Sequence, residues 1–85
     1  MTIKSEILLI KAKIAEKESR LQKLDLRANN HIITIRGIVD ANAYDEDFTE
    51  LGLDRAKASM DDFYAIWIEA KDLRAQIDKL EREIG

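Results

Sequence analysis

Hydrophobic residues recur along the first half of the chain at alternating steps of four and three. The series runs from Ile3 to Asn42 without a change of phase, which is the period of a helix that buries one face. This pattern predicts a helix over about residues 2–42. Its members, three of them polar, are Ile3, Ile7, Ile10, Ile14, Lys17, Leu21, Leu24, Ala28, His31, Ile35, Ile38 and Asn42.

The segment RANNHIITIRGIV, residues 27–39, is poorly suited to a helix by composition. Its β-branched residues and Gly37 together cost roughly 2 to 4 kcal/mol of helix stability. Burying one apolar face of the segment returns on the order of 6 kcal/mol, so we expect the helix to continue where a partner covers that face. The alternative is a strand over residues 31–39, for which no second strand is evident. The apolar face consists of Ile32, Ile35, Ile38 and Val39.

The segment NAYDEDFTELG, residues 42–52, breaks the periodicity with residues that favour turns and helix caps. It predicts an acidic turn at about residues 43–50. Asp47 and Glu50 have the spacing of a capping box, which starts the next helix at about residue 50, while Gly52 and Asp54 offer a later start. A turn centred near residue 47 places His31 opposite Phe63.

Apolar residues return at three and four spacing after this turn and predict a second helix over about residues 50–84. Either Ile66 or Trp67 fits the pattern, which indicates a local shift of phase there. The fold expected is all-α: one domain over residues 1–85, a long antiparallel helical hairpin with coiled-coil-like packing. The second series is Leu53, Ala56, Met60, Phe63, Ile66 or Trp67, Ala70, Leu73, Ile77, Leu80 and Ile84.

Further apolar residues lie outside these two series. On the first helix they line the side opposite the main series, and on the second they lie to one side of it. Isolated apolar residues are normal on a surface, but the sharper interpretation is that a second hairpin covers them, giving a homodimeric four-helix bundle. The oligomer interface predicted in this way consists of Leu8, Ala15, Leu26, Ile33, Tyr64 and Ile68.

The composition agrees with long helices, because 46% of the residues are hydrophobic, 36% are charged and proline is absent. The absence of cysteine excludes disulfides, thiol catalysis and thiolate metal sites. No apolar run approaches the ~20 residues that span a bilayer. The expected setting is therefore the cytoplasm, without a membrane partner.

Charge is unevenly distributed along the chain. Residues 1–39 carry eight basic and four acidic residues, a net charge of +4, whereas residues 40–62 carry two basic and eight acidic residues, a net charge of -6. A basic first helix permits binding to RNA or DNA. Its basic residues are spread around the helix among acidic ones, however, which favours ion pairing and solvation.

None of the recognised site chemistries fits the remaining residues. His31 has Ala28, where the Glu-x-x-His motif of di-iron bundles needs glutamate. Counted from Asp45, the acidic turn has Glu50 and Ala56 where a calcium loop needs glycine and glutamate. Neither a nucleophile beside a base nor a phosphate-binding glycine loop is recognisable. We therefore expect no enzyme activity, no cofactor and no bound metal.

His31 is better explained as a buried polar layer, since a polar residue in a helical seam often fixes register or oligomeric state. The function expected is that of a non-enzymatic structural or adaptor protein, which mediates protein–protein interaction through its helical surfaces. Its protein partner is unidentified. The alternative is a small helical-hairpin regulator that binds RNA or DNA through its basic first helix.

Overall fold

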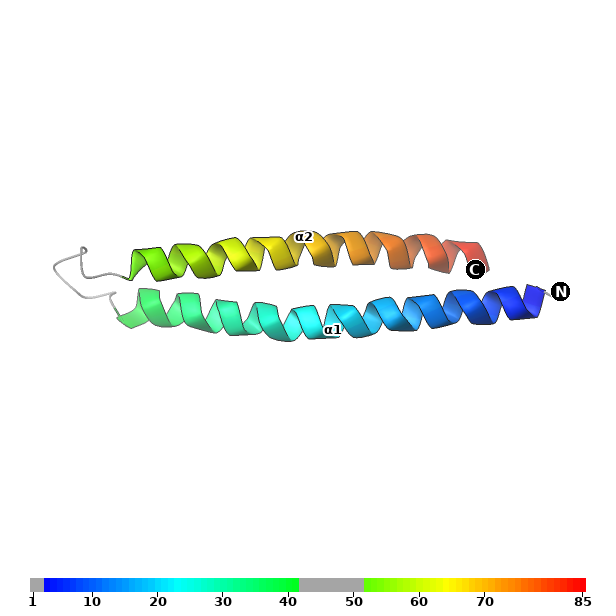
Figure 1. Cartoon of the computed structure of the whole chain (residues 1–85), viewed down its shortest axis with the longest axis horizontal. Helices are drawn as coiled ribbons and strands as arrows, with labels where there is room; N and C mark the ends of the chain where they lie inside the picture. Colours follow the sequence, from blue (N-terminus) through cyan, green and yellow to red (C-terminus); the bar gives the residue numbers. More distant parts are fainter. Residues whose placement is uncertain (1–2, 42–51) are drawn as a thin grey trace.

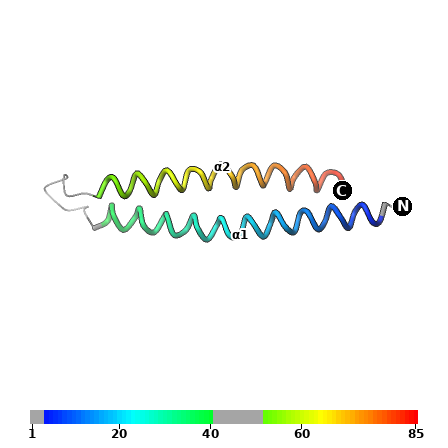
Figure 2. The backbone as a smooth tube through the Cα atoms, viewed as in Figure 1, coloured from blue at the N-terminus to red at the C-terminus, as the bar shows by residue number. Residues whose placement is uncertain are grey.

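The computed structural model describes residues 3–41 and 52–85, and these form two helices. Helix α1 (Ile3–Ala41) and helix α2 (Leu53–Ile84) run antiparallel, side by side along their length (Figure 1). The molecule is a rod with extents of 69 × 16 × 15 Å. Within the described residues, the tube view shows this pair of helices and no further layer (Figure 2). The predicted all-α hairpin is thus confirmed for the described residues.

Helix α1 passes through the segment RANNHIITIRGIV without interruption. The alternative of a strand over residues 31–39 is therefore wrong. No residue with a left-handed backbone conformation occurs in the described ranges, Gly37 included. Formation of the helix here follows the burial pattern in preference to the local propensity of the β-branched residues.

The seam of α1 follows the predicted series. Between residues 4 and 40, every residue outside this series is exposed. The most deeply buried side chain is Leu24, which is 1% exposed. The buried or half-buried residues are Ile7, Ile10, Ile14, Lys17, Leu21, Leu24, Ala28, His31, Ile35 and Ile38.

The seam of α2 differs from the predicted series at its start. Ser59 is only 8% exposed, whereas Met60 is 48% and Leu53 64% exposed. The buried and half-buried positions from Gly52 to Ile84 keep alternating steps of three and four, with Glu69 and Gln76 half-buried beside this series. The predicted shift of phase beside Trp67 is therefore wrong, because it arose from assigning Met60 instead of Ser59 to the seam. The seam is Gly52, Ala56, Ser59, Phe63, Ile66, Ala70, Leu73, Ile77, Leu80 and Ile84.

Helix α2 begins at Leu53, the later of the two starts considered, with Gly52 as its N-cap. The amide of Ala56 donates to the carbonyl of Gly52 over 3.0 Å, which closes the first helical turn. The predicted turn at residues 43–50, with its capping box, lies outside the described residues. Neither helix contains an apolar stretch long enough to cross a membrane.

Candidate functional site

A polar pair interrupts the apolar seam. Nδ1 of His31 lies 2.8 Å from Oγ of Ser59, so the two side chains share a hydrogen bond across the helices. Ser59 is buried and His31 is half-buried. The pairing satisfies both polar atoms, as groups withdrawn from water require. The sequence predicts Phe63 opposite His31. In the structure, His31 instead bonds Ser59, which lies one helical turn before Phe63.

A second polar link crosses the seam nearer to the end of the hairpin at which α1 begins and α2 ends. The ammonium group of Lys17 donates to Oε1 of Gln76 over 2.6 Å. The amide of Gln76 in turn donates to Oδ2 of Asp72, also over 2.6 Å, which orients the side chain of Gln76. Lys17 occupies a seam position, so this link allows a charged residue to stay there with a bonded head group.

Arg20 and Glu69 bridge one edge of the hairpin. Nε of Arg20 lies 2.6 Å from Oε2 of Glu69, and Nη2 lies 3.1 Å from Oε1, a two-point contact. The hydrogen bonds from Arg20 lower the pKa of Glu69 below its usual value, and the positive charges of Arg20 and Arg27 act in the same direction. Both side chains are over two-fifths exposed, so solvent screens this pair.

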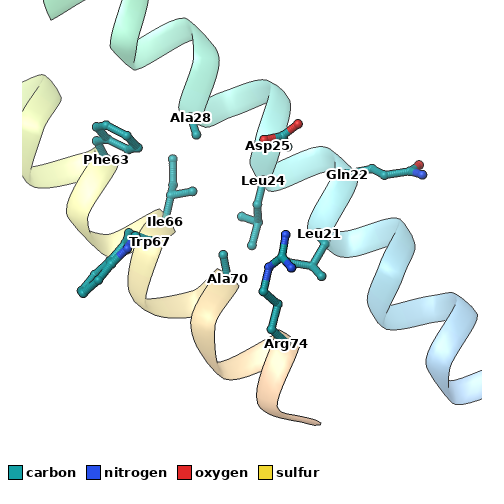
Figure 3. A pocket seen from close by; sticks show the side chains of 10 residues that line it. All are labelled: Leu21, Gln22, Leu24, Asp25, Ala28, Phe63, Ile66, Trp67, Ala70 and Arg74. Atoms are coloured by element: carbon teal, nitrogen blue, oxygen red, sulfur yellow. The ribbon is translucent and has the colours of Figure 1, made fainter. Parts of the chain in front are cut away.

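On the opposite edge the two helices leave an open groove of about 310 Å³. The groove forms where Ala28 and Ala70 are too small to fill the seam (Figure 3). Trp67 lines it beside the charged residues Asp25 and Arg74. Its lining provides neither a nucleophile beside a base nor a histidine. Within residues 3–41 and 52–85, no cluster of three potential metal ligands exists.

The predicted oligomer-interface residues all lie on the surface of the hairpin. The five large ones are between 49% and 68% exposed, and Ala15 is also exposed. They do not form one face, because Leu26 lies on the side of α1 turned away from its seam and Ile68 on the side of α2 turned away from its seam. These two sides face in opposite directions. A single flat neighbour therefore contacts only part of the predicted set.

Another apolar surface was missed by the sequence analysis. Each of its members directly follows a seam residue and is between 37% and 64% exposed. Three of them were assigned to the seam of the second helix, which hid their common exposure. We call this surface the flank patch; it consists of Ile32, Val39, Leu53, Met60 and Trp67.

Trp67 is part of an ordered aromatic cluster at the edge of the flank patch. The rings of Tyr64 and Trp67 are stacked, with centroids 5.5 Å apart and an interplanar angle of 25°. The ammonium group of Lys71 lies 4.4 Å from the centroid of Trp67, within range of a cation–π interaction. The sequence places these residues at three and four spacing, but it does not show that the cluster faces solvent.

Comparison with known proteins gives no relative: no family model, curated protein or solved structure matches the chain.

Proposed function

We propose that the protein is a non-enzymatic structural or adaptor module of the cytoplasm, which acts by presenting helical surfaces to a protein partner and to a second copy of itself. The observation that carries this proposal is the amount of apolar surface that the hairpin leaves uncovered. Eleven large hydrophobic residues of the described ranges are exposed, against five that are buried. Exposed apolar surface of this extent is typical of interaction sites.

The polar contacts of the molecule support the same proposal. The hydrogen bonds of His31, Lys17 and Arg20 all join one helix to the other, so these side chains hold the hairpin together. Side chains that are hydrogen-bonded between the helices position and align the two helices. The function is then that of a rigid rod whose exposed faces bind other proteins, with coiled-coil-like packing in its seam.

Sedimentation equilibrium over about 1 to 100 µM protein tests the self-association. We expect a dimer at about 10 µM, because covered apolar surface stabilises association in proportion to its area. Crosslinking in the native host followed by identification of the captured protein tests the adaptor role. A strictly monomeric protein that captures no protein partner would contradict the proposal.

Binding to RNA or DNA is a second candidate, and one surface favours it. A hollow of about 440 Å³ lies toward the start of α1 and the end of α2. It is lined by Lys13, Lys17 and Lys79, together with Glu83. Several positive charges on one face are what phosphate binding requires. A gel shift of labelled RNA and DNA at low salt tests this candidate, with Lys13→Glu and Lys79→Glu as variants. Absence of binding at low salt would exclude it.

A further inference from the structure

The flank patch lies on one edge of the rod and is built by both helices. Asp25 of α1 and Trp67 of α2 line the same groove (Figure 3), whereas Arg20 and Glu69 bridge the other edge. Residues seven apart share a side of a helix. The row that contains Asp25 therefore continues with Ile32 and Val39. The row that contains Trp67 includes Met60 and Leu53.

The centres of the two rows lie at about the same level of the rod. His31 is hydrogen-bonded to Ser59. A Cβ on Gly52 would lie 3.6 Å from Cγ2 of Ile38. Ile32 and Met60 directly follow the first of these seam pairs. The flank patch consequently has a middle formed by these two residues. On α2 it extends to both sides of that middle, to Leu53 and Trp67, whereas on α1 it extends to Val39 on one side and ends before Asp25 on the other.

Such a patch can pair with itself. Rotating a second hairpin by 180° about an axis through the Ile32–Met60 level, parallel to the line between the helices, sets flank on flank with the rods antiparallel. Met60 then meets Met60 of the second copy, Ile32 meets Ile32, and Leu53 meets Trp67. Val39 comes to the level of Asp25, so the apolar contact is concentrated on Ile32 and the α2 row. The groove beside Ala28 and Ala70 lies next to Trp67 and adds space for an inserted side chain.

The area of the patch matches what a stable dimer needs. At roughly 200 Å² for a fully exposed large side chain, the about half-exposed residues of the flank patch and the adjoining Tyr64 leave on the order of 600 Å² of mostly apolar surface open to solvent. A standard protein–protein interface buries about 800 Å² on each partner. Tyr64 stacks on Trp67 at the edge of the patch, so the two rings present one continuous aromatic surface to a neighbour.

Charge determines the orientation of the two rods. Residues 40–62 carry a net charge of -6, so a parallel pair would bring two strongly acidic ends together. In the antiparallel pair, Asp40 and Asp54, near the ends of α1 at Ala41 and of α2 at Leu53, lie toward the half of the second copy that carries Lys71 and Arg74. Attraction thus replaces repulsion at both ends of the shared surface.

We infer that the flank patch is the site at which a second copy of the chain binds, antiparallel and flank to flank, to form a four-helix bundle over the half of the rod nearer the connection. The inference rests on the proposed self-association and specifies the surface that carries it. This surface differs from the interface predicted from the sequence, since its centre is formed by Ile32 and Met60.

Sedimentation equilibrium of two matched glutamate variants tests the surface. Met60→Glu places a charge at the centre of the flank patch, whereas Leu26→Glu places the same charge on the side of α1 turned away from the seam. Both residues are exposed, so the hairpin itself should keep its helicity by circular dichroism. We expect the dimer dissociation constant to rise at least tenfold for Met60→Glu and to change less than twofold for Leu26→Glu.

Disulfide crosslinking tests the orientation, because the chain contains no cysteine of its own. We expect Met60→Cys to form a disulfide-linked dimer on mild oxidation and Ile33→Cys to stay monomeric under denaturing conditions. A dimer that Leu26→Glu disrupts and Met60→Glu leaves intact overturns the flank patch but keeps the proposed self-association. Crosslinking of Ile32→Cys with Met60→Cys, without crosslinking of Met60→Cys to itself, overturns the antiparallel orientation. A wild-type monomer at 100 µM overturns both proposals.

Discussion

Ser59 is buried although its side chain is polar, and its hydrogen bond to His31 explains why. A buried hydroxyl without a partner costs about 1 to 3 kcal/mol, whereas a satisfied one costs little. The rule that apolar residues define the seam therefore fails at this position. The sequence alone predicted His31 as a buried polar layer but gave no sign that a serine on the second helix is its hydrogen-bond partner.

Double-mutant analysis of this pair measures the hydrogen bond. We expect Ser59→Ala to lower the free energy of unfolding by about 1 kcal/mol, because His31 loses its partner. His31→Leu combined with Ser59→Ala replaces the polar layer by an apolar one, and we expect it to restore at least the wild-type stability. Urea denaturation of the wild type, both single variants and the double variant gives the coupling energy. Additive effects of the two substitutions would show that the pair contributes no hydrogen bond.

Glu69 supplies a pH-dependent contribution to stability. Its pKa is lowered in the folded protein by the hydrogen bonds from Arg20. The unfolded state consequently binds a proton more readily, so the stabilisation is complete above the ordinary carboxyl pKa of about 4.3 and is lost as the pH falls through the lower folded value. We expect Glu69→Gln to lower the melting temperature slightly at pH 7 in low salt and not at pH 2. The control is Glu18→Gln, an exposed glutamate of α1, which should leave the difference between the two pH values unchanged.

At the scale of the elements, the first helix was more predictable than the second. Its seam residues from Ile7 to Ile38 were identified one by one, since a long uninterrupted period leaves a single choice of buried face. In the second helix, Met60 stands next to Ser59, and choosing the apolar residue displaced the beginning of the series. The exposure of Leu53 and Trp67 could not be predicted, because it depends on which of two neighbouring rows faces the first helix.

The burial of α1 between residues 31 and 39 is also smaller than the sequence argument assumed. Ile35 and Ile38 lie in the seam, but Ile32 and Val39 are exposed on the flank patch. Two isoleucine side chains return about 3 to 6 kcal/mol, against a local helix penalty of roughly 2 to 4 kcal/mol. In the isolated hairpin, burial therefore stabilises this end of α1 by only slightly more than the local helix penalty. Covering the flank patch adds buried apolar surface and increases the net stability of this end.

Gly37 provides a direct test of that helix penalty. It is exposed within α1, and a Cβ added to it meets no atom within 4 Å. We therefore expect Gly37→Ala to raise the free energy of unfolding by about 1 kcal/mol, since alanine loses less backbone entropy in a helix. Ala58→Gly, an exposed position of α2, should change it by a similar amount in the opposite direction. Chemical denaturation measures both, and a neutral or destabilising Gly37→Ala would show that the glycine serves another purpose.

At the scale of the whole molecule, the long and thin shape limits how much apolar surface the hairpin can bury. The molecule is a rod of 69 × 16 × 15 Å, and the part of the chain that the structure describes forms two helices with one seam and no second layer. Within the described ranges its buried hydrophobic residues are few, and they are spread along the seam between Ile14 and Ile38 of α1 and between Ile66 and Ile77 of α2. The apolar surface outside the seam was evident in the sequence. Its division into separate faces became visible only once the orientation of both helices about the seam was known.

The uneven charge of the chain gives the final prediction, which concerns the effect of salt on self-association. In the proposed antiparallel dimer, the described acidic residues Asp40 and Asp54 of one copy lie toward Lys71 and Arg74 of the other. Each exposed pair contributes under about 1 kcal/mol, and salt screens it over a Debye length of about 10 Å at 0.1 M and 3 Å at 1 M. We expect the dissociation constant to rise several-fold between 0.05 and 0.5 M sodium chloride, measured by sedimentation equilibrium. Lys71→Gln combined with Arg74→Gln should weaken the dimer at low salt and reduce this dependence. A parallel dimer would show the opposite sign, because salt would relieve the repulsion between its acidic ends.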